Sequence, residues 1–349
     1  MTGWFVSILK WIHSWLGSYG WSVIVFSLLI KLCLLPLDIK SRRSMRAMSA
    51  LNPQLEKLKA RYANDQEKLN QKMQELYRKN KVNPLSGCLP LLIQLPILYI
   101  MFAAMRYVAA EIQLTTMGEW IKSFLSDGEG NLLGLEALQD VIEGLRNGSG
   151  LVNFGDTQGW LWVKSVFQPD SFSKTVIPTV SDILTNLNQY KDKIDLAEDL
   201  KQLLVLYAND TNGIASAVDN AVSSNVNYFS FNLFLNWFKI SIPRNWGTYV
   251  NGYFILPVLA GVSQWLSTKL QPTAADTSAN TSGSGKFMKW FFPIFSVWIC
   301  ISSNAAFAIY WVFVNAWSIV STIIINKMLD KEFAAKGNSS QPEKEALRP

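Results

Sequence analysis

The stretch WSVIVFSLLIKLCLLPL, residues 21–37, decides the fold class, because it is apolar enough to cross a membrane and carries a single charge, Lys31, near its middle. A membrane span needs about 20 predominantly apolar residues. An ammonium group at the centre of a spanning helix costs roughly 2.5–3.5 kcal/mol on insertion scales. Such a group is rarely there for stability, so we expect Lys31 to face water, a partner or both.

Three further uncharged stretches, 82–105, 245–268 and 290–326, repeat this pattern along the chain. The last covers 37 residues, which is too long for one span, and Asn304 marks a turn that would divide it. We therefore predict an all-α polytopic membrane protein with five transmembrane helices. Their predicted ranges are 21–39, 85–107, 250–269, 288–303 and 305–326.

The distribution of Lys and Arg predicts the orientation. Residues 39–81 hold 12 basic and four acidic residues, whereas residues 109–249 hold 16 acidic and nine basic ones. Short loops rich in Lys and Arg stay in the cytoplasm. We therefore place 40–82 and the tail 327–349 in the cytoplasm, and the amino terminus and 109–249 outside. The net charge of +6 is thus a topology signal and gives no support to nucleic-acid binding.

The segments outside the spans have distinct patterns. Residues 1–18 form a predicted amphipathic helix on the outer leaflet, and 270–287 form a polar cytoplasmic linker. Residues 40–82 predict a helical hairpin, which is either a structural linker or a basic docking surface. The extracytoplasmic loop 109–249 is enlarged, and it carries helical patterns at 132–146 and 181–207.

Several chemistries lack the residues they need. The only histidine, His13, lies in the amino-terminal amphipathic segment, and the apolar cores of the predicted spans carry no Asp or Glu. The sequence SGSGK at 282–286 fails as a phosphate-binding loop, because Asn280 and Phe287 replace the required Gly and Ser or Thr. We therefore predict no catalytic residue, no metal and no cofactor, and a protein that is not an enzyme.

Polar residues within the spans are the remaining candidates for a site. Ser27 lies one helical turn before Lys31, so the two share a face, while Gln94 and Gln264 lie in other spans. Each neutral side chain also fits an ordinary hydrogen bond between helices. Lys31 differs, because no acid deep in the membrane is available to pair with it. A shared water-filled cavity is the economical solution.

The chain also resembles a known family. The stretches SLLIKLCLLPLDIKSRRSMRAMSALNPQLEKLKARY (27–62), KLNQKMQELYRKNKVNPLSGCLPLLIQLPIL (68–98), FILPVLAGVSQWLSTKL (254–270) and MKWFFPIFSVWICISSNAAFAIYWVFVNAWSIVSTIIINK (288–327) are similar to the YidC family of membrane protein insertases. They cover about half of the chain, in the order that the family has.

The resemblance implies five helices around a hydrophilic groove that is open to the cytoplasm and to lipid. A basic residue stands in that groove at the position of Lys31, where bacterial members usually have Arg. Two further differences are Asn304-Ala305-Ala306 in place of Pro-Ala-Gly and an apparent insertion at about 173–249. The implied substrate-binding groove residues are Lys31, Ser27, Gln94, Gln264, Tyr310 and Trp311.

The resemblance further implies an insertase and chaperone for newly made proteins in a bacterial plasma membrane, working without nucleotide hydrolysis. Its expected partners are nascent membrane proteins and membrane lipids. The ribosome, the signal recognition particle or its receptor, and the Sec translocon are further candidates. Two alternatives stay open: a transporter or channel for small anions, and a structural factor for the assembly of membrane complexes.

Overall fold

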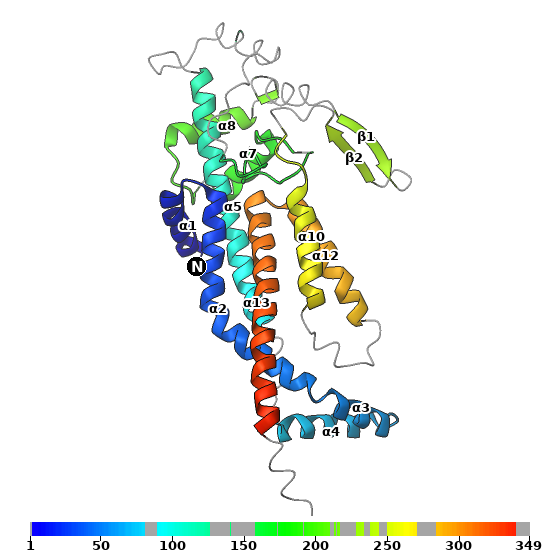
Figure 1. Cartoon of the computed structure of the whole chain (residues 1–349). Helices are drawn as coiled ribbons and strands as arrows, with labels where there is room; N and C mark the ends of the chain where they lie inside the picture. Colours follow the sequence, from blue (N-terminus) through cyan, green and yellow to red (C-terminus); the bar gives the residue numbers. More distant parts are fainter. Residues whose placement is uncertain are drawn as a thin grey trace, which may run out of the picture. The chain divides into compact units, whose positions relative to one another are not determined.

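The computed structural model describes residues 2–80, 89–125, 140, 158–172, 174–190, 192–209, 213, 215–216, 228–233, 238–243, 250–270 and 284–339 (Figure 1). The chain divides into two compact units. Unit 1 comprises Met1–Phe26, Ile100–Leu259 and Val297–Tyr310, and unit 2 comprises Ser27–Tyr99, Ala260–Ser296 and Trp311–Pro349.

Within the described residues, three helices are long and apolar enough to cross a membrane. They are α2 (Tyr19–Ser49), α5 (Leu89–Leu125) and α13 (Ala305–Ser339). Helix α12 (Ser284–Ser302) contains a shorter apolar part, and α10 (Ile255–Leu270) has 16 residues. Several long apolar helices are thus present as expected, while the number of five spans stays a prediction.

The three long helices continue past the predicted ends of their spans. Helix α2 runs to Ser49 where an end at 39 is predicted, α5 runs to Leu125 past 107, and α13 runs to Ser339 past 326. A change from apolar to polar sequence marks where a helix would leave a membrane, but the backbone hydrogen bonds of the helix need not stop there. Hydropathy therefore predicts the apolar part of each helix but not the helical residues that follow it.

The extension of α5 belongs to the hydrophobic core of unit 1. Leu114, Met117 and Ile121 recur at helical spacing and are almost fully buried. They share this core with α7 (Val180–Tyr190) and α8 (Glu198–Asn209). The helical pattern at 181–207 is thus two helices, and Glu198 and Asp199 in the first turn of α8 favour a new helix start.

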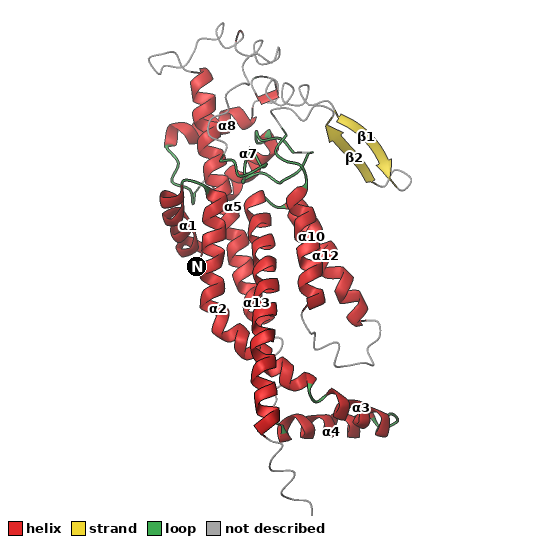
Figure 2. Ribbon diagram, viewed as in Figure 1, coloured by secondary structure: helices red, strands yellow, loops and turns green. Residues whose placement is uncertain are grey.

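A small sheet departs from the all-α prediction. Strands β1 (Tyr228–Leu233) and β2 (Phe238–Pro243) pair antiparallel, with Tyr228 opposite Pro243 (Figure 2). Their sequences, YFSFNL and FKISIP, alternate aromatic or β-branched residues with polar ones, which favours strands. The predicted helix at 132–146 and most of the linker at 270–287 lie outside the described residues.

Asp170 fixes the start of α10 in unit 1. Its buried carboxylate accepts hydrogen bonds from the backbone N–H groups of Tyr253 (2.9 Å), Phe254 (3.2 Å) and Leu256 (2.6 Å). These groups lie at the helix start, where N–H groups have no partner within the helix. Gly252 is required beside them, because a Cβ atom there would overlap with the Asp170 carboxylate.

The loop that contains Asp170 also fixes the start of α13. The buried side chain of Asn251 donates to the carbonyl oxygens of Ser165 and Gln168, at 2.9 and 3.0 Å. Gln168 in turn accepts a 2.9 Å hydrogen bond from the backbone N–H of Ala305. The Asn304 side chain accepts from the backbone N–H of Phe307 at 3.0 Å, so it acts as the N-cap of α13. Asn304 thus ends the turn between α12 and α13 with its own side chain.

Unit 2 contains the helical hairpin. Helices α3 (Asn52–Arg61) and α4 (Gln66–Lys79) contact each other, and each buries one leucine, Leu55 and Leu69. Asp65 caps α4 by accepting a hydrogen bond from the backbone N–H of Lys68 at 3.0 Å. This bond, together with the Lys68 ammonium, holds the pKa of the Asp65 carboxyl below its usual value.

We predict that Asp170→Asn destabilises unit 1. Hydrogen bonds to a charged group contribute about 1.5–3 kcal/mol each, so losing the charge of a buried carboxylate that accepts from three backbone N–H groups should cost on the order of 3 kcal/mol. The measurement is the apparent melting temperature of the purified full chain in detergent. Asp192→Asn, at an exposed carboxylate after α7, is the matched control. Equal melting of the two variants would show that Asp170 is not a structural cap.

Candidate functional site

Lys31 and Gln94 meet within unit 2. The Nζ atom of Lys31, on α2, donates a hydrogen bond to the Oε1 atom of Gln94, on α5, at 2.9 Å. Both side chains are partly buried. Within the described part of the chain, Lys31 forms no ion pair. Because an amide is neutral, this contact satisfies one N–H donor and leaves the positive charge uncompensated.

The acidic residue nearest along α2, Asp38, pairs with another base. The Oδ1 atom of Asp38 lies 3.1 Å from Nε of Arg42, and Nη1 of Arg42 donates to the Thr322 hydroxyl on α13 at 2.6 Å. The Arg42 side chain is only 6% exposed. Sequence reasoning missed this buried arginine; the spacing of four residues from Asp38 to Arg42 was the available signal.

Two more pairs attach α2 to α13 within unit 2. Arg43 lies 2.9 Å from Glu332, measured between Nη2 and Oε2, and Arg46 pairs with Asp330. These pairs are more exposed than the Arg42 contact, so each contributes about 0–1 kcal/mol. Together with Arg42 they connect the polar continuations of the two helices, a role that no apolar pattern in the sequence predicts.

The other predicted residues have different surroundings. Ser27 lies one turn before Lys31 and is fully buried, while Gln264 on α10 is partly exposed and its Nε2 atom lies 3.4 Å from the Thr268 hydroxyl. Trp311 donates from its indole N–H to the Ser296 hydroxyl on α12 at 3.1 Å. Tyr310 belongs to unit 1, where its ring is 2% exposed and lies 6.2 Å from that of Phe307.

The structure therefore brings together Lys31 and Gln94, and separately Trp311 and Ser296. Asn315, a polar residue within the apolar stretch 290–326, donates to the Ser263 hydroxyl at 3.2 Å and so joins α13 to α10. Neither Ser263 nor Ser296 has a sequence signal of its own, because serine is common in helices that pack closely. Both are hydrogen-bonding partners of the candidate residues.

Lys31 can attract an acidic group electrostatically. An ammonium has three donors and no acceptor, and Gln94 occupies one of the three. Water or a carboxylate can take the others. Because the charge stands in an apolar helix, its field is less screened than at a protein surface. The arrangement suits transient binding of an acidic group.

Comparison with known proteins decides the family. Residues 11–332 match the family described as 60Kd inner membrane protein. The chain belongs to the YidC family. It is a multi-pass membrane protein, and the resemblance seen in the sequence is confirmed.

Individual YidC relatives match over shorter stretches. The membrane protein insertase YidC of Fusobacterium nucleatum subsp. nucleatum is 50% identical over 99 residues, which are 28% of this chain and 48% of the relative. That of Aromatoleum aromaticum is 48% identical over 90 residues, 26% of this chain and 16% of the relative. That of Pseudomonas putida is 44% identical over 123 residues, 34% of this chain and 21% of the relative. The matches thus span less than half the length of these relatives.

We predict an energetic coupling between Lys31 and Gln94. Gln94→Leu should destabilise the protein, because it leaves the Lys31 ammonium without its amide acceptor. The same substitution should lower the stability less when Lys31 is already replaced by Met, because no ammonium then needs the acceptor. A coupling energy of about 1–2 kcal/mol is expected for a hydrogen bond to a charged group in a membrane protein. Melting of the two single variants and the double variant in detergent measures it.

Lys40→Met provides the control, because Lys40 is an exposed base further along the same helix. Its effect should add to that of Gln94→Leu without coupling. A coupling near zero for Lys31 and Gln94 would show that their hydrogen bond has no energetic role.

Proposed function

We propose that this YidC-family chain inserts newly made proteins into the bacterial plasma membrane and assists their folding, without catalysing a reaction. The observation that carries the proposal is the uncompensated charge of Lys31 on an apolar helix, held by the neutral Gln94. Family membership supports it, and the curated relatives are named as membrane protein insertases. A charge kept free of an acidic partner is suited to a passing substrate.

Magnitudes support an attraction step. A carboxylate at the membrane centre costs roughly 2.5–3.5 kcal/mol on insertion scales. Two opposite unit charges 4 Å apart attract by about 4 kcal/mol at an effective dielectric constant of 20. The Lys31 ammonium can therefore offset the cost of bringing one acidic residue of a substrate partway across. Lysine serves as a point charge here, because it lacks the two-pronged geometry of arginine.

The proposed orientation follows the charges of the loops. The hairpin of α3 and α4 and the end of α13 face the cytoplasm, and the amino terminus and the 109–249 loop lie outside. Acidic segments then move outward, a direction that the membrane potential favours by about 2.3 kcal/mol per charge and 100 mV. Transfer of the apolar substrate helix into lipid supplies the remaining driving force, and no nucleotide is consumed.

The remaining candidate residues have proposed supporting roles. Within unit 2, Gln264 hydrates the groove, Ser27 shares a helix face with Lys31, and Trp311 belongs to the groove wall. Tyr310 is the proposed wall residue of unit 1. The substrate helix leaves along α10 and α13. Among these residues we assign direct substrate contact to Gln264, because Ser27 and Tyr310 are almost fully buried.

The hairpin is the proposed docking surface for the nascent chain and its carriers. Its helices expose basic side chains and bury little apolar surface, an arrangement that favours electrostatic contact. The proposed binding partners of the hairpin are the ribosome, the signal recognition particle or its receptor, the Sec translocon and anionic lipids. The exposed basic residues are Lys57, Arg61, Lys68, Lys72, Arg78 and Lys79.

A photo-crosslinking residue at position 264 tests the proposal. We expect adducts with a ribosome-bound nascent membrane protein, because Gln264 is accessible and lies on the proposed path. The same crosslinker at Leu206, an exposed residue of α8 in the outer loop, is the control and should give none. Absence of adducts together with flux of small anions would favour a transporter. Absence of both would favour a structural assembly factor.

A further inference from the structure

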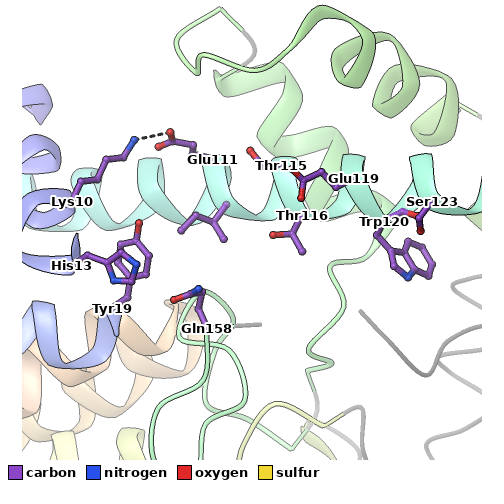
Figure 3. A pocket seen from close by; sticks show the side chains of 11 residues that line it. Lys10, His13, Tyr19, Glu111, Thr115, Thr116, Glu119, Trp120, Ser123 and Gln158 are labelled. Atoms are coloured by element: carbon purple, nitrogen blue, oxygen red, sulfur yellow. Dashed lines mark hydrogen bonds and ion pairs between the residues drawn. The ribbon is translucent and has the colours of Figure 1, made fainter. Parts of the chain in front are cut away.

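A cavity of about 660 Å³ lies in unit 1, apart from the residues discussed so far (Figure 3). Lys10 and His13 line it from α1 (Thr2–Leu16), and Tyr19 lines it from the first residue of α2. Helix α5 contributes Glu111 and Glu119, which lie two turns apart on one face. The volume lies within the range that suits a small ligand or a headgroup.

Glu111 is the most unusual group in this cavity. Its Oε1 atom pairs with Nζ of Lys10 at 2.6 Å, and its Oε2 atom is buried with no hydrogen-bond partner among the described residues. A buried carboxylate oxygen without a donor is unfavourable. A ligand with N–H donors would satisfy it, and Glu119 adds a second negative charge on the same face.

The residues around Glu111 suit both ends of a zwitterion. His13 stacks on Tyr19 with ring centroids 3.7 Å apart, and such aromatic faces favour an adjacent cation. Lys10 uses one donor on Glu111, so its ammonium has donors available for an anionic group. The ligand that fits carries a primary ammonium and an anion a few atoms away.

Helix α1 indicates where such a ligand comes from. It buries Val6, Leu9 and Ile12 against the protein and exposes Trp4, Trp11 and Trp15 on its outer side. Exposed tryptophans on an amphipathic helix are typical of a helix that lies at a membrane surface. With α1 on the membrane surface, the cavity that α1 lines would lie at the level of lipid headgroups.

We propose that this cavity binds the phosphoethanolamine headgroup of a lipid of the outer leaflet. The ammonium lies next to the Oε2 atom of Glu111, Glu119 adds a second negative charge further along the same helix, and the phosphate lies next to Lys10. The inference rests on the proposed placement of α1 at the outer surface and is independent of insertion activity. It gives the amino-terminal helix a lipid-specific attachment.

Native mass spectrometry of the full chain in detergent tests this, with short-chain phosphatidylethanolamine, phosphatidylcholine and phosphatidylglycerol added at equal concentrations. We expect preferential retention of phosphatidylethanolamine, because choline has no N–H donor and glycerol has no positive charge. Glu111→Gln should weaken retention about tenfold, the loss expected for one charge-assisted hydrogen bond. Glu119→Gln should weaken retention by a smaller factor, because it removes one of the two negative charges that attract the ammonium. Glu198→Gln, on α8 outside the cavity, is the matched control.

Glu119 is exposed and Glu119→Gln leaves the pair of Lys10 and Glu111 intact, so this variant tests binding even where Glu111→Gln disturbs folding. Equal retention of the three lipids, or retention unchanged in Glu119→Gln, would overturn the proposal. Displacement of the bound lipid by soluble O-phosphoethanolamine at the same concentration would show that the headgroup alone is sufficient for binding. That result would overturn the assignment of a lipid as the ligand. An insertion defect in these variants has no bearing on the binding result.

Discussion

The hydrogen bond from Lys31 to Gln94 is the interaction on which the functional account depends. A comparison of two basic residues on α2, Arg42 and Lys31, shows the effect of this hydrogen bond. Arg42 lies eleven residues after Lys31, about three helical turns, and its charge is compensated by Asp38 and fixed to Thr322. Among the described residues, Lys31 forms no ion pair, and its hydrogen bond to the Gln94 amide holds the side chain without neutralising it. One helix thus carries a structural cation and an available one.

Within unit 1, buried hydrogen bonds fix the starts of two apolar helices. Asp170 caps α10 and Asn251 organises the loop that holds the first backbone N–H groups of α13. These contacts are buried, so water does not compete for them. Asn304 performs its capping role with its own side chain.

The sequence predicted the apolar helices, the isolated charge of Lys31 and the family, because each has a strong local signal. It did not predict that Lys31 would bond to Gln94, since a contact between residues 63 apart depends on helix packing. Burial of Ser27 and the pairing of Trp311 with Ser296 were missed for the same reason. The extension of α5 was missed because its apolar face packs against α7 and α8. A hydropathy profile does not show which distant segments of the chain pack against each other.

Reversal of the charge at position 31 tests the central claim most directly. Insertion of one substrate would be measured with an outer segment carrying aspartate, asparagine or lysine, in the native protein, in Lys31→Glu and in Lys40→Glu as control. We expect Lys31→Glu to impair insertion of the aspartate substrate most and of the lysine substrate least, whereas Lys40→Glu should leave insertion of all three substrates as in the native protein. Equal impairment of all three substrates by Lys31→Glu would contradict the central claim, because the role of Lys31 would then not be attraction of charge.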